Sequence, residues 1–204
     1  MPVACDMSSN IGTVEVPWEK FGIVYMGSQK NLGTAGCTVM VIREDLLGKA
    51  EPDVPILCDW TTHENSPDTY YNTPAVFPMY ITGLYCKYMN RMGGLDYYIE
   101  QANKRGKHVW DYIDNCGGYY TSKITDTQYR SRVNICFRVA GGNEALEELF
   151  VEEAKKYGIV QIKGHTFNPG IRVSMYNSMP FDGAKYLVEF MKFFKSKYRC
   201  LPKL

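Results

Sequence analysis

The order of strand-like and helix-like segments in the second half of the chain limits its fold more than any other feature. Apolar runs and helical patterns alternate there, at 119–120, 134–139, 144–157, 159–162, 171–176 and 181–198. The third and the last have helical spacing, and the others read as strands. A long helix at 95–115 precedes them. The order β-β-α-β-β-α is typical of an α+β unit, so we expect residues 95–204 to form a complete small α+β domain.

The first half of the chain has a different pattern. Strands are predicted at Val3–Cys5, 21–26 and 37–43, and one long helix at 75–92. A single helix is too little to cover a parallel sheet on both faces. We therefore expect residues 1–94 to be the C-terminal part of a larger, mostly parallel-sheet domain. Residues 44–74 are irregular and rich in proline, and segments of this kind usually carry function.

Charge and cysteine content argue against several classes of protein. The net charge of +1 gives no electrostatic footprint for nucleic acid. No apolar run approaches the roughly 20 residues of a membrane-spanning helix, and the N-terminus lacks the pattern of a signal peptide. The seven cysteines are scattered, form no CxxC pair and do not lie at ligand spacing from a histidine. We expect reduced thiols in the cytoplasm, several of them buried, and no metal site.

Lys30 lies in a short connection with glycines on both sides, YMGSQKNLGTAG at residues 25–36, between two apolar runs. Composition alone favours a solvated turn lysine. The alternative is an amine held at the end of a strand, where it forms an imine with a carbonyl group. That chemistry needs the free amine, which desolvation or a neighbouring cofactor cation favours.

Asp6 ends the first apolar run and is followed by the turn-like residues Met-Ser-Ser-Asn. Such an aspartate most often caps a turn through its side chain. The alternative is a buried carboxylate that pairs with a ring nitrogen and keeps it protonated. A lysine together with such an acid is what an enzyme dependent on pyridoxal phosphate (PLP) requires.

Six sequence blocks, in this order and spacing, resemble the phosphoserine aminotransferases, and the resemblance covers essentially the whole chain. They are CDMSSN, FGIVYMGSQKNLGTAGCTVMVIREDLLG, YYNTP, GGL, RSRVNICF and KGHTFNPGIRVSMYNSM. The resemblance implies an α/β fold, that of the fold-type I PLP-dependent transferases of class V. It also implies PLP as the cofactor and a cytoplasmic homodimer with a shared active site.

The resemblance assigns roles to residues around the cofactor. It implies that Lys30 carries PLP and moves a proton as acid and base, and that Gln29 helps to hold the cofactor phosphate. Asp6 would pair with the pyridine nitrogen. Asn72 and Thr73 would reach the cofactor phosphate from the partner subunit. Without the resemblance, Asn72 and Thr73 read as a helix N-terminus, with Thr73 as the cap before a proline.

Two further residues are implied to bind the substrate. Arg172 would bind its α-carboxylate, because a guanidinium fork matches a carboxylate. His165 would bind its phosphate. Without the resemblance, His165 is equally well a loop histidine and Arg172 a surface cation. The implied reaction transfers the amino group of glutamate to 3-phosphohydroxypyruvate, in serine biosynthesis, and its partners are small amino and oxo acids.

The chain departs from the family pattern in two ways. Thr166 stands where the family has an arginine after the histidine, and losing a charge-assisted bond to phosphate costs roughly 1.5–3 kcal/mol. This leaves open a same-fold aminotransferase for a non-phosphorylated substrate. Members of the family are also nearly twice as long. This leaves open a non-catalytic remnant or a subunit that needs a separate N-terminal half.

Overall fold

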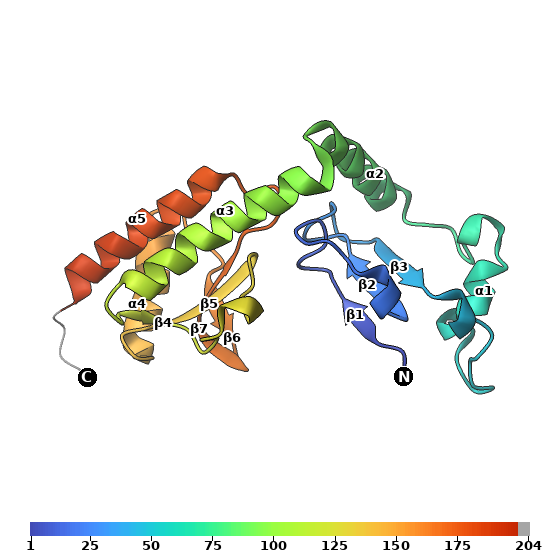
Figure 1. The fold of residues 1–204 in the computed structure, drawn as a ribbon, viewed down its shortest axis with the longest axis horizontal. Coiled ribbons are helices and arrows are strands. Elements are labelled where there is room, and N and C mark those ends of the chain that lie inside the picture. The colour runs from blue at the N-terminus through green and yellow to red at the C-terminus, as the bar shows by residue number, and fades with distance from the viewer. Residues whose placement is uncertain (200–204) are drawn as a thin grey trace. The chain divides into compact units, whose positions relative to one another are not determined.

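The computed structural model describes residues 1–199, which fall into two compact units. The N-terminal unit is Met1–Leu95, and the C-terminal unit begins at Asp96. Each unit has its own β-sheet: β1 to β3 belong to the first and β4 to β7 to the second (Figure 1).

The N-terminal unit is built on a three-stranded sheet in the order β1-β2-β3. The strands are β1 (Ala4–Asp6), β2 (Ile23–Gly27) and β3 (Thr38–Ile42). β1 runs parallel to β2, and β3 runs antiparallel to it. The three predicted strands are thus confirmed. A small apolar core lies against this sheet, made of Met7, Val24, Met26 and Leu32.

The predicted long helix is confirmed as α2 (Val76–Arg91). Its N-cap is Ala75, which makes no side-chain cap bond, so the expectation that Thr73 caps the helix is wrong. Between β3 and α2 the backbone forms only short helices. They are η2 (Glu44–Leu46), η3 (Ile56–Cys58), α1 (Trp60–Glu64) and η4 (Pro67–Thr69), and η1 (Trp18–Lys20) lies earlier in the chain.

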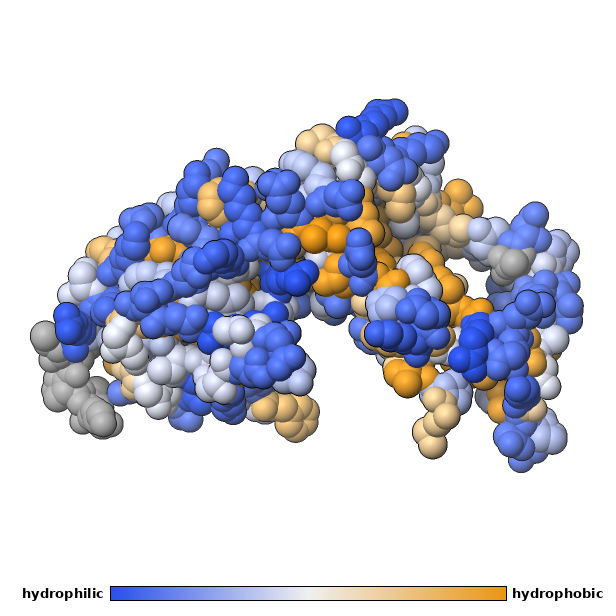
Figure 2. Space-filling view, in the orientation of Figure 1, coloured by the Kyte–Doolittle hydropathy of each residue, from blue (hydrophilic) through white to orange (hydrophobic). Residues whose placement is uncertain are grey.

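Apolar side chains remain exposed over much of the N-terminal unit. Figure 2 shows them gathered on the visible face of this unit, whereas the C-terminal unit is mostly polar on that face. On α2 the exposed apolar side chains recur at helical spacing: Phe77, Tyr80, Leu84 and Tyr88. A patch of this extent normally marks a surface that another part or partner covers.

The C-terminal unit is an antiparallel sheet in the order β4-β5-β7-β6 with three helices. Its strands are β4 (Tyr120–Thr121), β5 (Asn134–Val139), β6 (Lys163–His165) and β7 (Asn168–Ser174). Its helices are α3 (Gly94–Asn115), which starts just before the unit boundary, α4 (Glu144–Lys156) and α5 (Phe181–Tyr198). The predicted order β-β-α-β-β-α is confirmed. Asn143 accepts a bond from the Leu146 N–H and caps α4, which explains where that helix begins.

All three helices pack on one face of this sheet. The inward residues of β5 alternate, with Ile135, Phe137 and Val139 fully buried against the helices. Phe150 of α4 lies at the centre of an aromatic cluster and contacts the rings of Phe137 and Phe194 edge to face. The opposite face of β5 and β7 carries the polar side chains of both strands.

The strand expected at 159–162 is wrong, because the ladder starts at Lys163. Ile159 and Ile162 do pack against the core, which explains the apolar pattern. The backbone is not extended there, however, since Gln161 has a φ of 61°. The regular pairing of β6 with β7 then breaks again, at a bulge between Lys163 and His165.

Two further sequence expectations concern the whole chain. Of the cysteines within residues 1–199, all six are free but only Cys116 is buried, so the expectation of several buried thiols is wrong. Cys200 lies outside the described residues. Among the described helices, none combines the length and the apolar character needed to cross a bilayer.

Candidate functional site

Asp6 and Lys30 come together because of the parallel pairing of β1 with β2. Asp6 is the last residue of β1, and Lys30 follows the end of β2 by three residues. Parallel strands bring their carboxyl ends to the same edge of a sheet, and ligands usually bind in the loops at that edge. A hydrogen bond also joins the ends of the two strands, because Gly27 donates its N–H to the Ser8 hydroxyl at 2.9 Å.

The Lys30 ammonium is held by the loop that follows β1. Its Nζ donates to Ser9 Oγ at 3.0 Å, and the side chain is half-buried. Asn31 is buried and donates its side-chain N–H to the Ser9 carbonyl at 2.6 Å. The lysine loop and the serine loop are therefore tied together at two points, which restricts the position of the amine.

Hydrogen bonds from the same serine loop keep the Asp6 carboxylate ionised. Its carboxylate accepts the Ser8 N–H at 2.8 Å, which closes an Asx-turn, and it also interacts with the Ser8 hydroxyl. The two Ser8 bonds lower the pKa of Asp6, and the nearby charge of Lys30 lowers it further. Asp6 is exposed rather than buried, and the Asx-turn is confirmed. The pairing of its carboxylate with a ring nitrogen stays a prediction.

Two glycines let the lysine loop pack closely on α2. A side chain at Gly33, which has a φ of +154°, would meet Thr82 at 3.2 Å. One at Gly36, which has a φ of +112°, would meet Pro78 at 2.8 Å. Both glycines therefore have a backbone conformation that L-residues avoid, and a Cβ would be tightly packed at Gly33 and would overlap its neighbour at Gly36. The glycines around Lys30 have a structural reason as well as any functional one.

Replacing Ser8 with alanine is expected to raise the pKa of Asp6 towards its ordinary value. The hydroxyl is the largest of the interactions that lower this pKa. Because the folded-state pKa lies below the unfolded one, the interaction stabilises the unit above the unfolded pKa. That stability is lost as pH falls through the folded pKa. A carboxyl ¹³C NMR titration measures the change. Asp126, whose pKa is lowered by Gln128, serves as the internal reference. An Asp6 pKa that is the same in both proteins would contradict this assignment.

The other predicted cofactor residues lie at different places in the N-terminal unit. Gln29 is exposed and lies directly before Lys30. The side chain of Gln29 packs against Gly27, where a Cβ would overlap the Gln29 amide. Asn72 and Thr73 are exposed in the segment between η4 and α2. No contact joins them to Lys30 or Asp6 among the described residues.

Arg172 lies on the sheet face that the helices leave uncovered. It pairs across the sheet with Cys136, and its strand neighbours Ile171 and Val173 point into the core. The side chain is exposed, and its guanidinium has no hydrogen-bond or ion-pair partner within residues 1–199. On the same face Arg138 is already engaged, because Glu147 accepts from its Nε at 2.6 Å. Arg172 is thus a cation open to an external anion.

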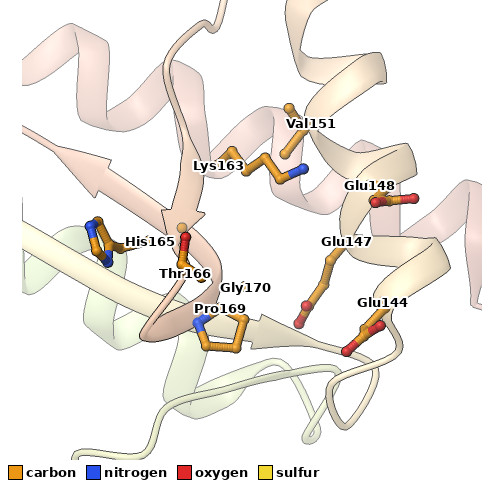
Figure 3. A pocket seen from close by; sticks show the side chains of 10 residues that line it. Glu144, Glu147, Glu148, Val151, Lys163, His165, Thr166, Pro169 and Gly170 are labelled. Atoms are coloured by element: carbon orange, nitrogen blue, oxygen red, sulfur yellow. The ribbon is translucent and has the colours of Figure 1, made fainter.

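The β6–β7 hairpin carries both His165 and Arg172, and the pairing of its strands is irregular. Lys163 pairs with Ile171 and His165 with Asn168, so three steps along β7 lie opposite two steps along β6, and the extra residue belongs to β7. Lys163 pairs with the inward-facing Ile171 and points towards α4. Figure 3 shows this divergence: Lys163 extends towards Val151 and Glu148, and His165 points away from them. A regular strand would have placed positions 163 and 165 on one face.

The structure thus gathers the predicted residues into two groups. Lys30, Asp6 and the neighbouring Gln29 belong to the N-terminal unit, and His165 and Arg172 lie on the β6–β7 hairpin of the C-terminal unit. Sequence reasoning missed Ser8 and Ser9 as the side chains that hold Asp6 and Lys30. Their position directly after Asp6, in a polar turn, was the available signal.

Comparisons with known proteins found a matching family and similar chains. The family described as Aminotransferase class-V matches residues 1–187. A phosphoserine aminotransferase of Chromobacterium violaceum is 41% identical over 198 residues, which is 97% of this chain and 54% of that protein. A probable phosphoserine aminotransferase of Dictyostelium discoideum is 42% identical over 190 residues, which is 92% of this chain and 50% of that protein.

Solved structures of similar proteins give the same result for the fold. A phosphoserine aminotransferase from Bacillus circulans subsp. alkalophilus aligns with a TM-score of 0.89 at 37% identity, over 96% of this chain and 53% of that one. A PLP-bound phosphoserine aminotransferase from Trichomonas vaginalis aligns with a TM-score of 0.85 at 31% identity, over 94% and 53%. The predicted α/β fold of these PLP-dependent enzymes is confirmed over about half their length. The chain spans about half the length of the relatives it matches.

Proposed function

Because this chain belongs to the class-V aminotransferase family, we propose that it carries out PLP-dependent transamination, with glutamate and 3-phosphohydroxypyruvate giving 2-oxoglutarate and phosphoserine. This reaction would serve serine biosynthesis in the cytoplasm. One observation carries the proposal: an amine and an ionised carboxylate lie together at the carboxyl edge of two parallel strands. The substrates are small amino and oxo acids.

The residues present fit PLP at its three reactive or charged groups. Lys30 supplies an amine for the aldehyde carbon, and Asp6 supplies an ionised carboxylate for the ring nitrogen. Gln29, in the same loop, supplies an amide donor for the phosphate. Bound PLP provides an electron sink for the carbanion that forms when the substrate loses its Cα proton. The donor set of the N-terminal unit therefore matches the chemistry that this cofactor needs.

Lys30 and Asp6 then have distinct tasks. Lys30, as a free amine, would take the proton from the substrate Cα and return it to the cofactor carbon, as base and then acid. Ser9 keeps the amine oriented, because Lys30 donates to its hydroxyl. Asp6 holds the ring proton by charge pairing, and its lowered pKa keeps it ionised at neutral pH.

Arg172 and His165, both on the β6–β7 hairpin, are proposed to bind the substrate. The planar fork of Arg172 can accept a carboxylate in two parallel bonds, and no acidic side chain of the described residues occupies it. His165 donates from its ring to the far end of the substrate. Asn72 and Thr73 are proposed to reach the cofactor phosphate of a second copy, in a homodimer with a shared site. Their exposure leaves them accessible for this.

A comparison of amino acceptors tests the proposed substrate. With the chain, PLP and glutamate, formation of 2-oxoglutarate is expected to be at least about tenfold faster with 3-phosphohydroxypyruvate than with pyruvate or glyoxylate. Equal rates would overturn the phosphoserine assignment. They would favour the second candidate, a same-fold aminotransferase for a non-phosphorylated substrate. That candidate is favoured by one observation, namely that residues 164–169 contain no lysine or arginine.

A further inference from the structure

The tip of the β6–β7 hairpin carries an aromatic side chain that contributes almost nothing to the core. Phe167 is 92% exposed. Full burial of such a side chain stabilises a fold by about 1.5–3 kcal/mol, and the exposed Phe167 does not provide this stabilisation. Phe167 nevertheless makes two specific contacts, and both are with His165. The two rings stack with centroids 5.5 Å apart and planes at 27°, and the Phe167 N–H donates to His165 Nδ1 at 3.3 Å.

The backbone contact fixes the form of the imidazole. A nitrogen that accepts an N–H bond carries no proton, so the ring proton of His165 resides on Nε2. The stacked phenyl ring covers one face of the imidazole and limits its rotation. The Nε2–H is then the one donor that the ring offers.

No cation of the hairpin tip supplements this donor. Thr166 contributes a hydroxyl, and Lys163 points towards α4 (Figure 3). A cavity of about 200 Å³ lies beside the hairpin, and Glu144, Glu147 and Glu148 of α4 line it together with Lys163, His165 and Thr166. Its three carboxylates oppose an anion inside the cavity, and the ring of His165 points away from them (Figure 3). Recognition at the tip therefore depends on the orientation of one imidazole.

We propose that Phe167 is a positioning residue for substrate recognition: it holds His165 in the neutral Nε2–H tautomer, so that this N–H receives the far end of the substrate. The inference rests on the proposed function, because that function places the substrate at His165. It goes beyond that function by assigning a role to an exposed aromatic residue. The ring of Phe167 provides the stacking contact and its backbone provides the hydrogen bond, so the two parts are separable by substitution.

Imidazole ¹⁵N NMR of the chain tests the tautomer without cofactor or activity. The chain has only three histidines, and His165→Gln assigns the signal of interest. At about pH 8 the ¹⁵N shifts are expected to report the Nε2–H tautomer for His165. Phe167→Pro removes the backbone donor and is expected to give a mixture of tautomers, with the amide signals of β7 confirming that the hairpin is intact. A predominant Nδ1–H form in the unchanged chain would overturn the inference.

Phosphoserine titration followed at the same nucleus tests the recognition role. Phe167→Ala is expected to weaken binding by about 3- to 10-fold, since it loosens a single hydrogen-bond donor. Phe167→Tyr retains the stacking ring and is expected to restore the unchanged affinity. Equal affinities for the alanine variant and the unchanged chain would overturn the inference. The proposed function fails by a separate result, the absence of a PLP link to Lys30, so the two failures are distinguishable.

Discussion

Replacing Lys30 with alanine is expected to abolish transamination and the absorption band of the covalent lysine–PLP link. Lys30 supplies both the amine that forms the link and the group that moves the proton, so no other residue of the loop replaces it. The rate constant kcat is expected to fall by at least about 10³-fold. Absorption spectra of the PLP-treated chain and a 2-oxoglutarate assay measure the two effects.

Two matched variants separate the chemistry of Lys30 from its charge. Lys30→Arg keeps a cation that can donate to Ser9, yet it cannot form the link, so it is expected to be as inactive as the alanine variant. Lys20→Ala removes an exposed cation from the same unit and is expected to leave the band unchanged. Circular dichroism establishes that each variant is folded. A band that persists in Lys30→Ala would assign the link to another lysine.

Replacing Arg172 with alanine is expected to raise the KM for the amino-acid substrate by about 10- to 150-fold. The side chain is proposed to make a two-bond, charge-assisted contact with a carboxylate, and such contacts contribute roughly 1.5–3 kcal/mol. The fold should tolerate the change, because Arg172 is exposed and has no hydrogen-bond or ion-pair partner among the described residues. Steady-state kinetics with varied glutamate measure the effect.

The controls for Arg172 use the same strand pair. Arg172→Lys retains the charge and loses the planar fork, so an intermediate KM is expected. Lys163→Ala removes a cation of the same hairpin that points towards α4, and less than about a twofold change in KM is expected. If Lys163→Ala raised KM as much as Arg172→Ala, a general electrostatic effect would explain the result better than carboxylate binding.

The regular elements of the chain could be predicted because local signals agree with the tertiary packing. The helices of the C-terminal unit begin and end close to where caps, glycines and apolar spacing place them. The strand expected at 159–162 failed because Ile159 and Ile162 are apolar for packing on the core, while the backbone turns at Gln161. Apolar pattern reports burial, and burial does not require a strand.

The candidate site was predictable in its residue types and less so in its contacts. The link between Lys30 and Ser9 depends on the pairing of β1 with β2, which joins residues 21 positions apart. The divergence of Lys163 and His165 depends on the irregular pairing of β6 with β7, and the residues around it are mostly exposed and leave no apolar pattern. Neither feature follows from a periodic pattern in the local sequence, so neither could be predicted without the three-dimensional structure.

The roles implied by the resemblance differ in the physical support that the structure gives them. The pairing of Lys30 with the serine loop and the ionised state of Asp6 give physical support to their proposed roles. Gln29, Asn72 and Thr73 are accessible, and their roles stay predictions. Thr73 shows how a familiar local pattern misleads: a threonine before a proline predicts a cap, but α2 begins two residues beyond that proline.

The most direct test of the central claim is to find which residue of the unchanged chain takes up PLP. The chain is incubated with PLP, the product is reduced with borohydride to make any lysine link permanent, and the digested peptides are mapped by mass spectrometry. A phosphopyridoxyl group on Lys30, in excess over every other lysine, is the predicted result. A chain that carries no label, or carries it evenly over its exposed lysines, would contradict the account.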